Sequence, residues 1–177
     1  WTVYATDLDG DADADVLSAS FDDDKIAWYE NQGGGVFGAQ QVITTAADGA
    51  KYVYATDLDG DGDADVLSCS YYDNKVAWYE NLGGGAFGTQ QVIDSPDRPN
   101  CVYATDLDGD GDADVLAVIY GTWTIAWYEN LGGGLFGSLK SISNSLSNPF
   151  SVYATDLDGD GDADVLSASH SDDKIAW

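Results

Sequence analysis

The stretch Val53-Tyr-Ala-Thr-Asp-Leu-Asp-Gly-Asp-Gly-Asp-Ala-Asp-Val-Leu67 occurs twice more without change, from Val102 to Leu116 and from Val152 to Leu166. A fourth copy, from Val3 to Leu17, differs only at Ala12, where the others have glycine. Equivalent valines are therefore separated by about 50 residues, a period at which repeat proteins stack units that cannot bury their apolar face alone. The repeat is the unit of the architecture.

Each copy contains an acidic loop with the spacing D-x-D-x-D-G-x-x-D, or with alanine in place of the glycine in the first copy. Carboxylates this close repel one another by a few kcal/mol per pair at an effective dielectric near 20, so a folded loop of this kind requires a cation. Calcium takes about six to eight oxygen ligands, and alternate carboxylates of a tight turn supply most of that shell. The spacing predicts one calcium site per repeat. The alternative, an acidic solvated turn without metal, is weakened because the motif occurs four times in register.

We expect the side chains at loop positions one, three, five and nine to ligate calcium. The residue at position seven would contribute its backbone carbonyl, and water would complete the shell. The predicted metal-site residues are Asp7, Asp9, Asp11, Asp13 and Asp15 in the first loop, Asp57, Asp59, Asp61, Asp63 and Asp65 in the second, Asp106, Asp108, Asp110, Asp112 and Asp114 in the third, and Asp156, Asp158, Asp160, Asp162 and Asp164 in the fourth.

Glycine at the sixth loop position permits a sharp bend. Ala12 occupies this position in the first loop. A positive φ at an alanine costs about 1 kcal/mol, so we expect the first site to be the weakest.

The residues around each loop alternate in polarity as β-strands do. In the second repeat we expect strands at 53–56, 64–70, 75–80 and 87–93, the last after the turn Gly83-Gly-Gly85. An EF-hand or dockerin would place helices around the loop, but β-branched and aromatic residues flank it at period two. The fold class is therefore all-β, with four short antiparallel strands per repeat.

Four-stranded antiparallel units with small residues on the second strand are typical of β-propeller blades. We expect a single repeat domain with three complete blades at 3–52, 53–101 and 102–151. A fourth, at 152–177, is incomplete, because Trp177 aligns with the third-strand residues Trp28, Trp78 and Trp127. These tryptophans are predicted to lie in the core or between blades. The chain would be part of a longer or oligomerically completed propeller, or a compact four-bladed ring.

The acidic loop, followed by Trp78-Tyr-Glu-Asn-Leu-Gly-Gly-Gly-Ala-Phe-Gly88, resembles the FG-GAP/VCBS repeat family, which includes the propeller of integrin α subunits. The resemblance covers essentially the whole chain. It implies an extracellular calcium-stabilised propeller that serves in adhesion, in carbohydrate contact or as a platform beside another domain. The motif is specific for the fold and the metal and says little about a ligand.

Charge excludes some partners. The chain has 32 acidic and 6 basic residues and a formal net charge of −26, whereas nucleic acids and anionic membranes require a basic footprint. No apolar run approaches the roughly 18 residues that suggest a membrane-spanning helix. An export signal, which the expected extracellular location requires, would lie outside this segment.

Catalysis is not expected. His170 is the only histidine, and repeated aspartates bound to calcium stay ionised, whereas a glycosidase needs two carboxylates in different environments. Cys69 and Cys101 occupy different positions of their repeats, so they form either a bridge between neighbouring repeats or two buried free thiols.

In an up-and-down meander the connections alternate between two ends of the blade. The calcium loops and glycine turns should share one end, and the turns at 21–25, 71–75, 120–124 and 170–174, which vary most between copies, should share the other. A constant metal end and a variable opposite end are typical of a binding scaffold.

Trp123 stands out at the variable end, because the other copies have Asp24, Asn74 and Asp173 there. Exposed beside Tyr120, it would offer a stacking platform for a sugar ring. Alternatively, Trp123 fills a gap left by Gly121 or packs against a neighbouring subunit.

Three hypotheses follow. The first is a calcium-rigidified structural or adhesion module, the second a lectin-like domain that uses the variable end, and the third a non-catalytic platform of a secreted enzyme. The expected partners are calcium, glycans or extracellular proteins, and further copies that associate through the incomplete blade.

Overall fold

The computed structural model describes all 177 residues and contains strands without helices. Blade 1 consists of β1 (Thr2–Thr6), β2 (Asp15–Ser20), β3 (Lys25–Tyr29) and β4 (Gln41–Thr44). Blade 2 consists of β5 (Ala50–Thr56), β6 (Asp65–Ser70), β7 (Lys75–Tyr79) and β8 (Gln91–Asp94). Blade 3 consists of β9 (Pro99–Thr105), β10 (Asp114–Ile119), β11 (Thr124–Tyr128) and β12 (Lys140–Ser143), and blade 4 of β13 (Pro149–Thr155), β14 (Asp164–Ser169) and β15 (Lys174–Ala176).

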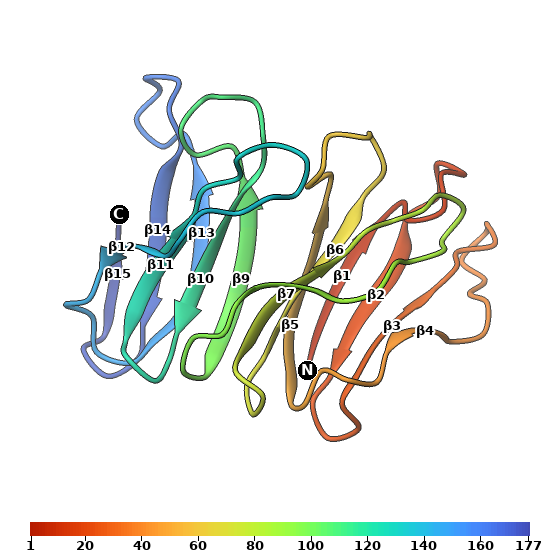
Figure 1. The fold of residues 1–177 in the computed structure, drawn as a ribbon, viewed down its shortest axis with the longest axis horizontal. Helices are drawn as coiled ribbons and strands as arrows, with labels where there is room; N and C mark the ends of the chain where they lie inside the picture. Colours follow the sequence, from red (N-terminus) through yellow and green to blue (C-terminus); the bar gives the residue numbers. More distant parts are fainter.

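Every sheet is an antiparallel meander in chain order, which confirms the predicted all-β, propeller-type blades. Figure 1 shows the four sheets standing side by side, with the acidic loops along the upper edge. The first strands of successive blades lie next to one another and align one tyrosine from each. The ring centroids are 4.7 Å apart for Tyr4 and Tyr54, 4.8 Å for Tyr54 and Tyr103, and 4.7 Å for Tyr103 and Tyr153. We call this column the tyrosine ladder.

The core consists of three joints between neighbouring blades. At the joint of blades 1 and 2, Leu17 and Ile26 of blade 1 pack against Val53 and Val66 of blade 2. The same repeat positions form the joints of blades 2 and 3 and of blades 3 and 4. Each of the two inner sheets thus buries one face against the preceding blade and the other against the following one.

Two of the four third-strand tryptophans confirm the predicted role at the blade interfaces, whereas Trp127 is half-buried and Trp177 is 73% exposed, because no further blade covers it. Trp28 and Trp78 are 2% and 3% exposed. Each lies under the glycine turn of the next blade: a methyl group built on Gly85 would lie 2.3 Å from Trp28, and one built on Gly134 would lie 2.4 Å from Trp78. The third glycine of the turn is therefore required by a close approach as well as by its positive φ.

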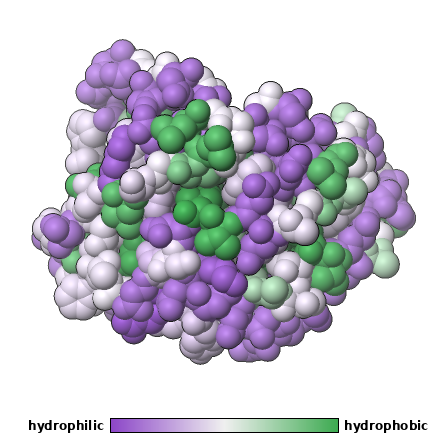
Figure 2. All heavy atoms as spheres, viewed as in Figure 1, coloured by the Kyte–Doolittle hydropathy of each residue, from purple (hydrophilic) through white to green (hydrophobic).

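The two outer blades expose positions that the inner joints bury. Val3 is 70% exposed, whereas its equivalents Val53 and Val102 are fully buried. Ile175 is 83% exposed, whereas its equivalent Ile26 is fully buried. Figure 2 shows polar residues along the upper edge and an apolar patch near the centre of this view, at the joint of blades 2 and 3, where Val92 and Leu135 are exposed.

Some strand boundaries differ from the prediction. The first strands of blades 2, 3 and 4 begin three residues earlier than the repeat valine, because a register shift lets Ala50, Pro99 and Pro149 pair with the second strand. The fourth strand of blade 2 begins only at Gln91, since Phe87 forms an isolated bridge to Asn81 instead.

Cys69 and Cys101 are buried free thiols, so the disulfide alternative is wrong. Because the chain forms no helix, it has none long and apolar enough to span a membrane.

Candidate metal centres and the variable end

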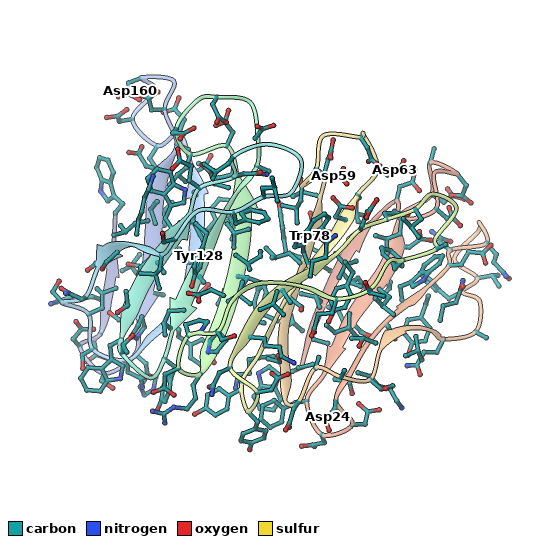
Figure 3. All side chains as sticks on the ribbon, in the orientation of Figure 1. Asp24, Asp59, Asp63, Trp78, Tyr128 and Asp160 are labelled. Carbon is teal, nitrogen blue, oxygen red and sulfur yellow. The ribbon has the colours of Figure 1, made fainter.

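The acidic loops and glycine turns share one end of the blades, as predicted. Figure 3 shows Asp59, Asp63 and Asp160 along the upper edge, and Asp24 of a variable turn at the opposite end. Hydrogen bonds tie each glycine turn of the first three blades to the loop beside it. In blade 2, the backbone N–H of Asn81, which begins the turn, donates to the Oδ1 atom of Asp65 at 2.8 Å.

The structure brings carboxylates of each loop together at one point. In every loop, three aspartates each place one oxygen within 4.8 Å of the others: Asp7, Asp9 and Asp15; Asp57, Asp59 and Asp61; Asp106, Asp108 and Asp114; and Asp156, Asp158 and Asp164. Positions one and three take part in all four clusters, position nine in three and position five in one. The seventh-position residues Asp13, Asp63, Asp112 and Asp162 contribute no side chain to these clusters, and their predicted role through the carbonyl remains a prediction.

Backbone N–H groups shape each loop around its own carboxylates. Asp57 accepts hydrogen bonds from the N–H groups of Gly60 at 2.7 Å and Gly62 at 2.9 Å. Asp61 accepts one from the N–H of Asp63 at 2.9 Å. The same three bonds recur in the other loops. Because each carboxylate oxygen has two lone pairs, these bonds leave acceptor capacity for a cation.

The aspartate at the ninth position anchors the acidic loop to the body of the blade. Asp65 is fully buried and accepts hydrogen bonds from the N–H groups of Leu58 at 2.9 Å and Asn81 at 2.8 Å. Burial raises the pKa of Asp65 to about 6, against the effect of those two bonds, and the carboxylates of Asp59 and Asp61 raise it further. Burial is also the main cause of the raised pKa of Asp59.

This donor set fits calcium. It contains hard oxygen donors and no imidazole or thiol, which excludes a site of the zinc or copper type. Carboxylates whose pKa is raised by burial and by one another lack a compensating positive charge. A divalent cation held by these oxygens would provide it.

The bend at the sixth position has a positive φ in every loop. The φ angle is 96° at Gly62, 99° at Gly111 and 100° at Gly161, and it is 74° at Ala12. Alanine is therefore held in a backbone conformation that glycine adopts without strain. The positive φ considered for Ala12 is thus present, and the weaker calcium binding of the first loop stays a prediction.

An asparagine of the following blade binds each of the first two acidic loops. The Nδ2 group of Asn81 donates to the carbonyl of Leu8 in the preceding loop at 2.9 Å and to that of Ala64 in its own loop at 3.1 Å. Asn130 does the same with Leu58 at 2.8 Å and Ala113 at 3.0 Å. Sequence reasoning missed this role, although the signal was present in the repeated Trp-Tyr-Glu-Asn motif.

At the variable end, Trp123 has a φ of 55° and is 49% exposed. Its equivalents Asp24 and Asn74 also have a positive φ, but their side chains compensate for it. The Oδ1 atom of Asp24 accepts a hydrogen bond from the N–H of Gly49 at 2.8 Å, and that of Asn74 accepts one from Arg98 at 2.9 Å. The indole of Trp123 has no acceptor for such a bond.

Trp123 does not fill a gap left by Gly121. A methyl group built on Gly121 would lie 2.1 Å from the carboxylate of Asp97, so that space is already occupied. Tyr120, which the sequence pairs with Trp123, is half-buried and lines a pocket of about 460 Å³ at this end. Trp123 is not among the residues that line it.

The model of the FG-GAP-like repeat matches residues 7–68, 57–117 and 106–167. The chain belongs to this family. Each match begins at the first aspartate of an acidic loop and extends into the second strand of the following blade, so the loop is the constant feature of this FG-GAP-like chain. Curated protein sequences give no match.

Solved structures support the fold of the FG-GAP-like chain. An Agrocybe aegerita lectin, described as recognising non-reducing terminal N-acetylglucosamine, is similar at 22% identity with a TM-score of 0.66 over 94% of this chain and 46% of the lectin. The V. cholerae biofilm matrix protein Bap1 is similar at 24% identity with a TM-score of 0.58, over 94% of this chain and 23% of Bap1.

The Tc holotoxin pore of Photorhabdus luminescens is similar at 23% identity with a TM-score of 0.56, over 93% of this chain and 8% of the toxin chain. The FG-GAP-like chain thus spans less than half the length of these structures. At such identities the similarity establishes the fold alone.

Proposed function

We propose that this FG-GAP-like chain is a calcium-binding, non-catalytic module that serves as a structural or adhesive part of an extracellular protein. The observation that carries the proposal is the convergence of three carboxylate oxygens within 4.8 Å in all four loops. Carboxylate-rich oxygen sites of this kind suit the calcium-replete exterior of cells.

The chain's own residues explain how metal binding would stiffen the module. The aspartates at positions one and five hold the loop backbone through its N–H groups, and the ninth aspartate fixes the loop to the glycine turn. Asn81 connects the first loop to blade 2, and Asn130 connects the second loop to blade 3. Bound calcium would supply the positive charge that these carboxylates lack, and the asparagines would make these two loops part of a blade joint.

Thermal unfolding of two variants in the second loop tests the calcium proposal. Asp61→Ala removes a carboxylate of the cluster, whereas Asp63→Ala removes a side chain outside it. We expect the difference in Tm between calcium and chelator to shrink in Asp61→Ala and to stay near that of the wild type in Asp63→Ala. Loss of one site that was filled at 100 times its Kd removes about 2.7 kcal/mol of stabilisation.

Using the calcium-induced shift as the readout separates metal binding from any effect of the substitution on the metal-free fold. Equal shrinkage of the shift in both variants would refute the ligand assignment. A wild-type chain that melts alike in calcium and in chelator would refute the calcium proposal as a whole.

Carbohydrate recognition at the variable end is a second candidate function. It is favoured by Trp123, which is exposed in a left-handed backbone conformation without the hydrogen bond that its equivalents make. Strain of this kind collects at functional sites. A glycan array tests this function with three samples: the calcium-loaded chain, the chelated chain and the Trp123→Ala variant. Glycan binding that requires calcium and is lost in the variant would support the lectin hypothesis. Absence of glycan binding by the folded, calcium-loaded chain would oppose it.

A further inference from the structure

We propose that the pocket at the variable end binds an acidic sugar, a pyranose that carries a carboxylate, with Lys51 as the contact of that carboxylate. This inference rests on the hypothesis that the variable end binds carbohydrate, places the site in this pocket instead of at Trp123, and names the ligand class. The axial pocket, as we call it, has a volume of about 460 Å³. Its walls include Lys51, Asn100 and Phe150, which lie two residues before the repeat valine, and the aromatic residues that begin the variable turns.

The repeat does not dictate the chemistry of this pocket. From the valine onward the last three copies are identical for fifteen residues. Two residues before that valine, however, they have Lys51, Asn100 and Phe150, a cation, an amide and an aromatic ring. The differences between copies thus converge on one cavity, whereas the constant residues build the blade and the metal loop.

Lys51 is the only one of the six basic residues that forms no ion pair. The other five pair with a carboxylate: Lys25 with Asp23, Lys75 with Asp73, Arg98 with Asp97, Lys140 with Glu129, and Lys174 with Asp172. The chain has 32 acidic residues, so a lysine without a carboxylate partner is unexpected. The axial pocket therefore presents an uncompensated positive charge.

Aromatic rings hold the Lys51 ammonium group in place. Its Nζ atom lies 4.4 Å from the ring centroid of Trp1, 5.2 Å from that of Phe21 and 5.4 Å from that of Tyr71. Cation–π contacts of this kind fix the position of the ammonium group but leave its three N–H groups to donate to an anion.

The two asparagines of the pocket supply hydrogen-bond acceptors. The Oδ1 atom of Asn148 is buried without a hydrogen-bond partner, and such an atom costs free energy until a donor satisfies it. Asn100 uses its Nδ2 group to donate to the carbonyl of Phe150 at 3.0 Å, which leaves its Oδ1 atom as the acceptor. Both asparagines line the axial pocket.

One cation, neutral acceptors and several aromatic rings match the three parts of an acidic sugar. The carboxylate would accept from Lys51, the hydroxyl groups would donate to the asparagines, and the apolar face of the pyranose would stack on the rings. An acidic peptide matches the cation alone. The metal loops lie at the opposite end of the blades, so calcium would not contact the sugar (Figure 3).

Titration calorimetry of the calcium-loaded chain with glucuronic acid and with glucose tests the proposal, because the two sugars differ in the carboxylate. We expect glucuronic acid to bind at least about tenfold more tightly, a difference of about 1.4 kcal/mol. Lys51→Met should abolish this preference. Lys140→Met is the matched control, because Lys140 also lies over an aromatic ring, 4.1 Å from the centroid of Trp127, but outside the pocket.

A further variant locates the site. Phe150→Ala, which removes an exposed ring of the pocket, should weaken the binding of both sugars. Equal affinity for the two sugars, or full binding by Lys51→Met, would overturn the proposal. If an equal concentration of acetate displaces glucuronic acid, the pocket is a simple anion site and the sugar proposal is wrong. If an oligo-aspartate peptide competes equally well, the pocket is a protein-binding site and the sugar proposal is likewise wrong.

The calcium-induced shift in Tm is measured on the same samples. A wild-type chain with a normal shift but no sugar binding would count against the axial pocket alone. A missing shift would count against the calcium proposal and leave the sugar titration as an independent result.

Discussion

Ala12 is the residue at which the first acidic loop departs from the others. It adopts a φ of 74° where the other loops have glycine, so Ala12→Gly should relieve about 1 kcal/mol of backbone strain. We expect the variant to unfold at a higher temperature in calcium and to bind calcium more tightly at the first loop. Thermal melts and calcium titration measure both effects.

The flexibility of glycine in the unfolded chain opposes this gain. The reverse change at an equivalent position, Gly62→Ala, is the control and should destabilise the second loop. If Ala12→Gly lowers the Tm in calcium, the strain assigned to Ala12 is absent.

Trp123 is strained for a different reason, because it lacks a side-chain acceptor for the neighbouring blade connection. Trp123→Asn should accept a hydrogen bond from the backbone N–H of Asn148, equivalent to the bond that Asn74 accepts from the N–H of Arg98. Relief of the left-handed strain and one new hydrogen bond should together stabilise the chain by about 1–2 kcal/mol. Denaturant unfolding measures this change, and Asn74→Ala, which breaks the existing bond, is its counterpart.

A loss of stability in Trp123→Asn would mean that the indole packs against the protein and is not a free platform. A gain in stability together with lost glycan binding would indicate that the chain keeps Trp123 for recognition at a cost in stability.

At the scale of the blade, the contact between tryptophan and glycine turn controls how closely two sheets approach. Gly85 and Gly35 occupy the same turn position and have similar positive φ angles of 73° and 79°. Only Gly85 lies against a tryptophan, Trp28 of the preceding blade; no atom lies within 4 Å of a methyl group built on Gly35. The pair therefore separates backbone strain from packing.

We expect Gly35→Ala to cost about 1 kcal/mol through strain alone. Gly85→Ala should cost about 1–3 kcal/mol more, because its methyl group overpacks the joint. Chemical denaturation compares the two variants. Equal costs would show that Trp28 can move away and that the joint is not closely packed there.

The sequence predicts the blades well because each depends on local signals. Alternating strands, the glycine turn and the acidic loop all lie within one repeat, and the position of Trp78 at a blade interface follows from its recurrence. The early start of β5 at Ala50 depends on a register shift with β6, which the sequence does not reveal. Local patterns predict strands better than they predict strand ends.

The parts of the site that the sequence missed depend on contacts between blades. Asn81 reaches the carbonyl of Leu8 across a joint. The repeated Trp-Tyr-Glu-Asn motif marks this asparagine, but it does not indicate the partner in the preceding blade. The axial pocket combines residues of all four blades, so its composition becomes visible only when the repeats are stacked. Which three aspartates of a loop bring their oxygens together likewise depends on the conformation of the loop, and the spacing of the aspartates in the sequence does not reveal it.

At the scale of the whole molecule, the net charge of −26 makes stability depend on pH and metal together. The pKa of Asp65 is about 6 in the folded chain, above the ordinary value of 3.8, chiefly because Asp65 is buried. The folded state of the metal-free chain therefore binds a proton that the unfolded state lacks between these two values. The free energy of unfolding of the metal-free chain should therefore increase as the pH falls from 7 through about 6. This added stability should disappear again as the pH rises.

Thermal melts of the metal-depleted chain across this range check the sign. In saturating calcium the direction should reverse, since protons then compete with the metal for the same oxygens. Asp23 and Asp172, which are paired with lysines, have a lowered pKa and would lose their contribution only under more acidic conditions. A metal-free chain that melts at a lower temperature at pH 6 than at pH 7 would contradict the prediction.

The tyrosine ladder gives the assembled blades an optical property. Its three ring pairs have nearly the same centroid separation and the same interplanar angle of 48°. Chromophores in such a regular column couple electronically, and identical geometry makes the three couplings add with one sign. The near-ultraviolet circular dichroism of the phenol rings should therefore scale with the number of closed joints, so that the chain contains its own label-free counter of stacked blades.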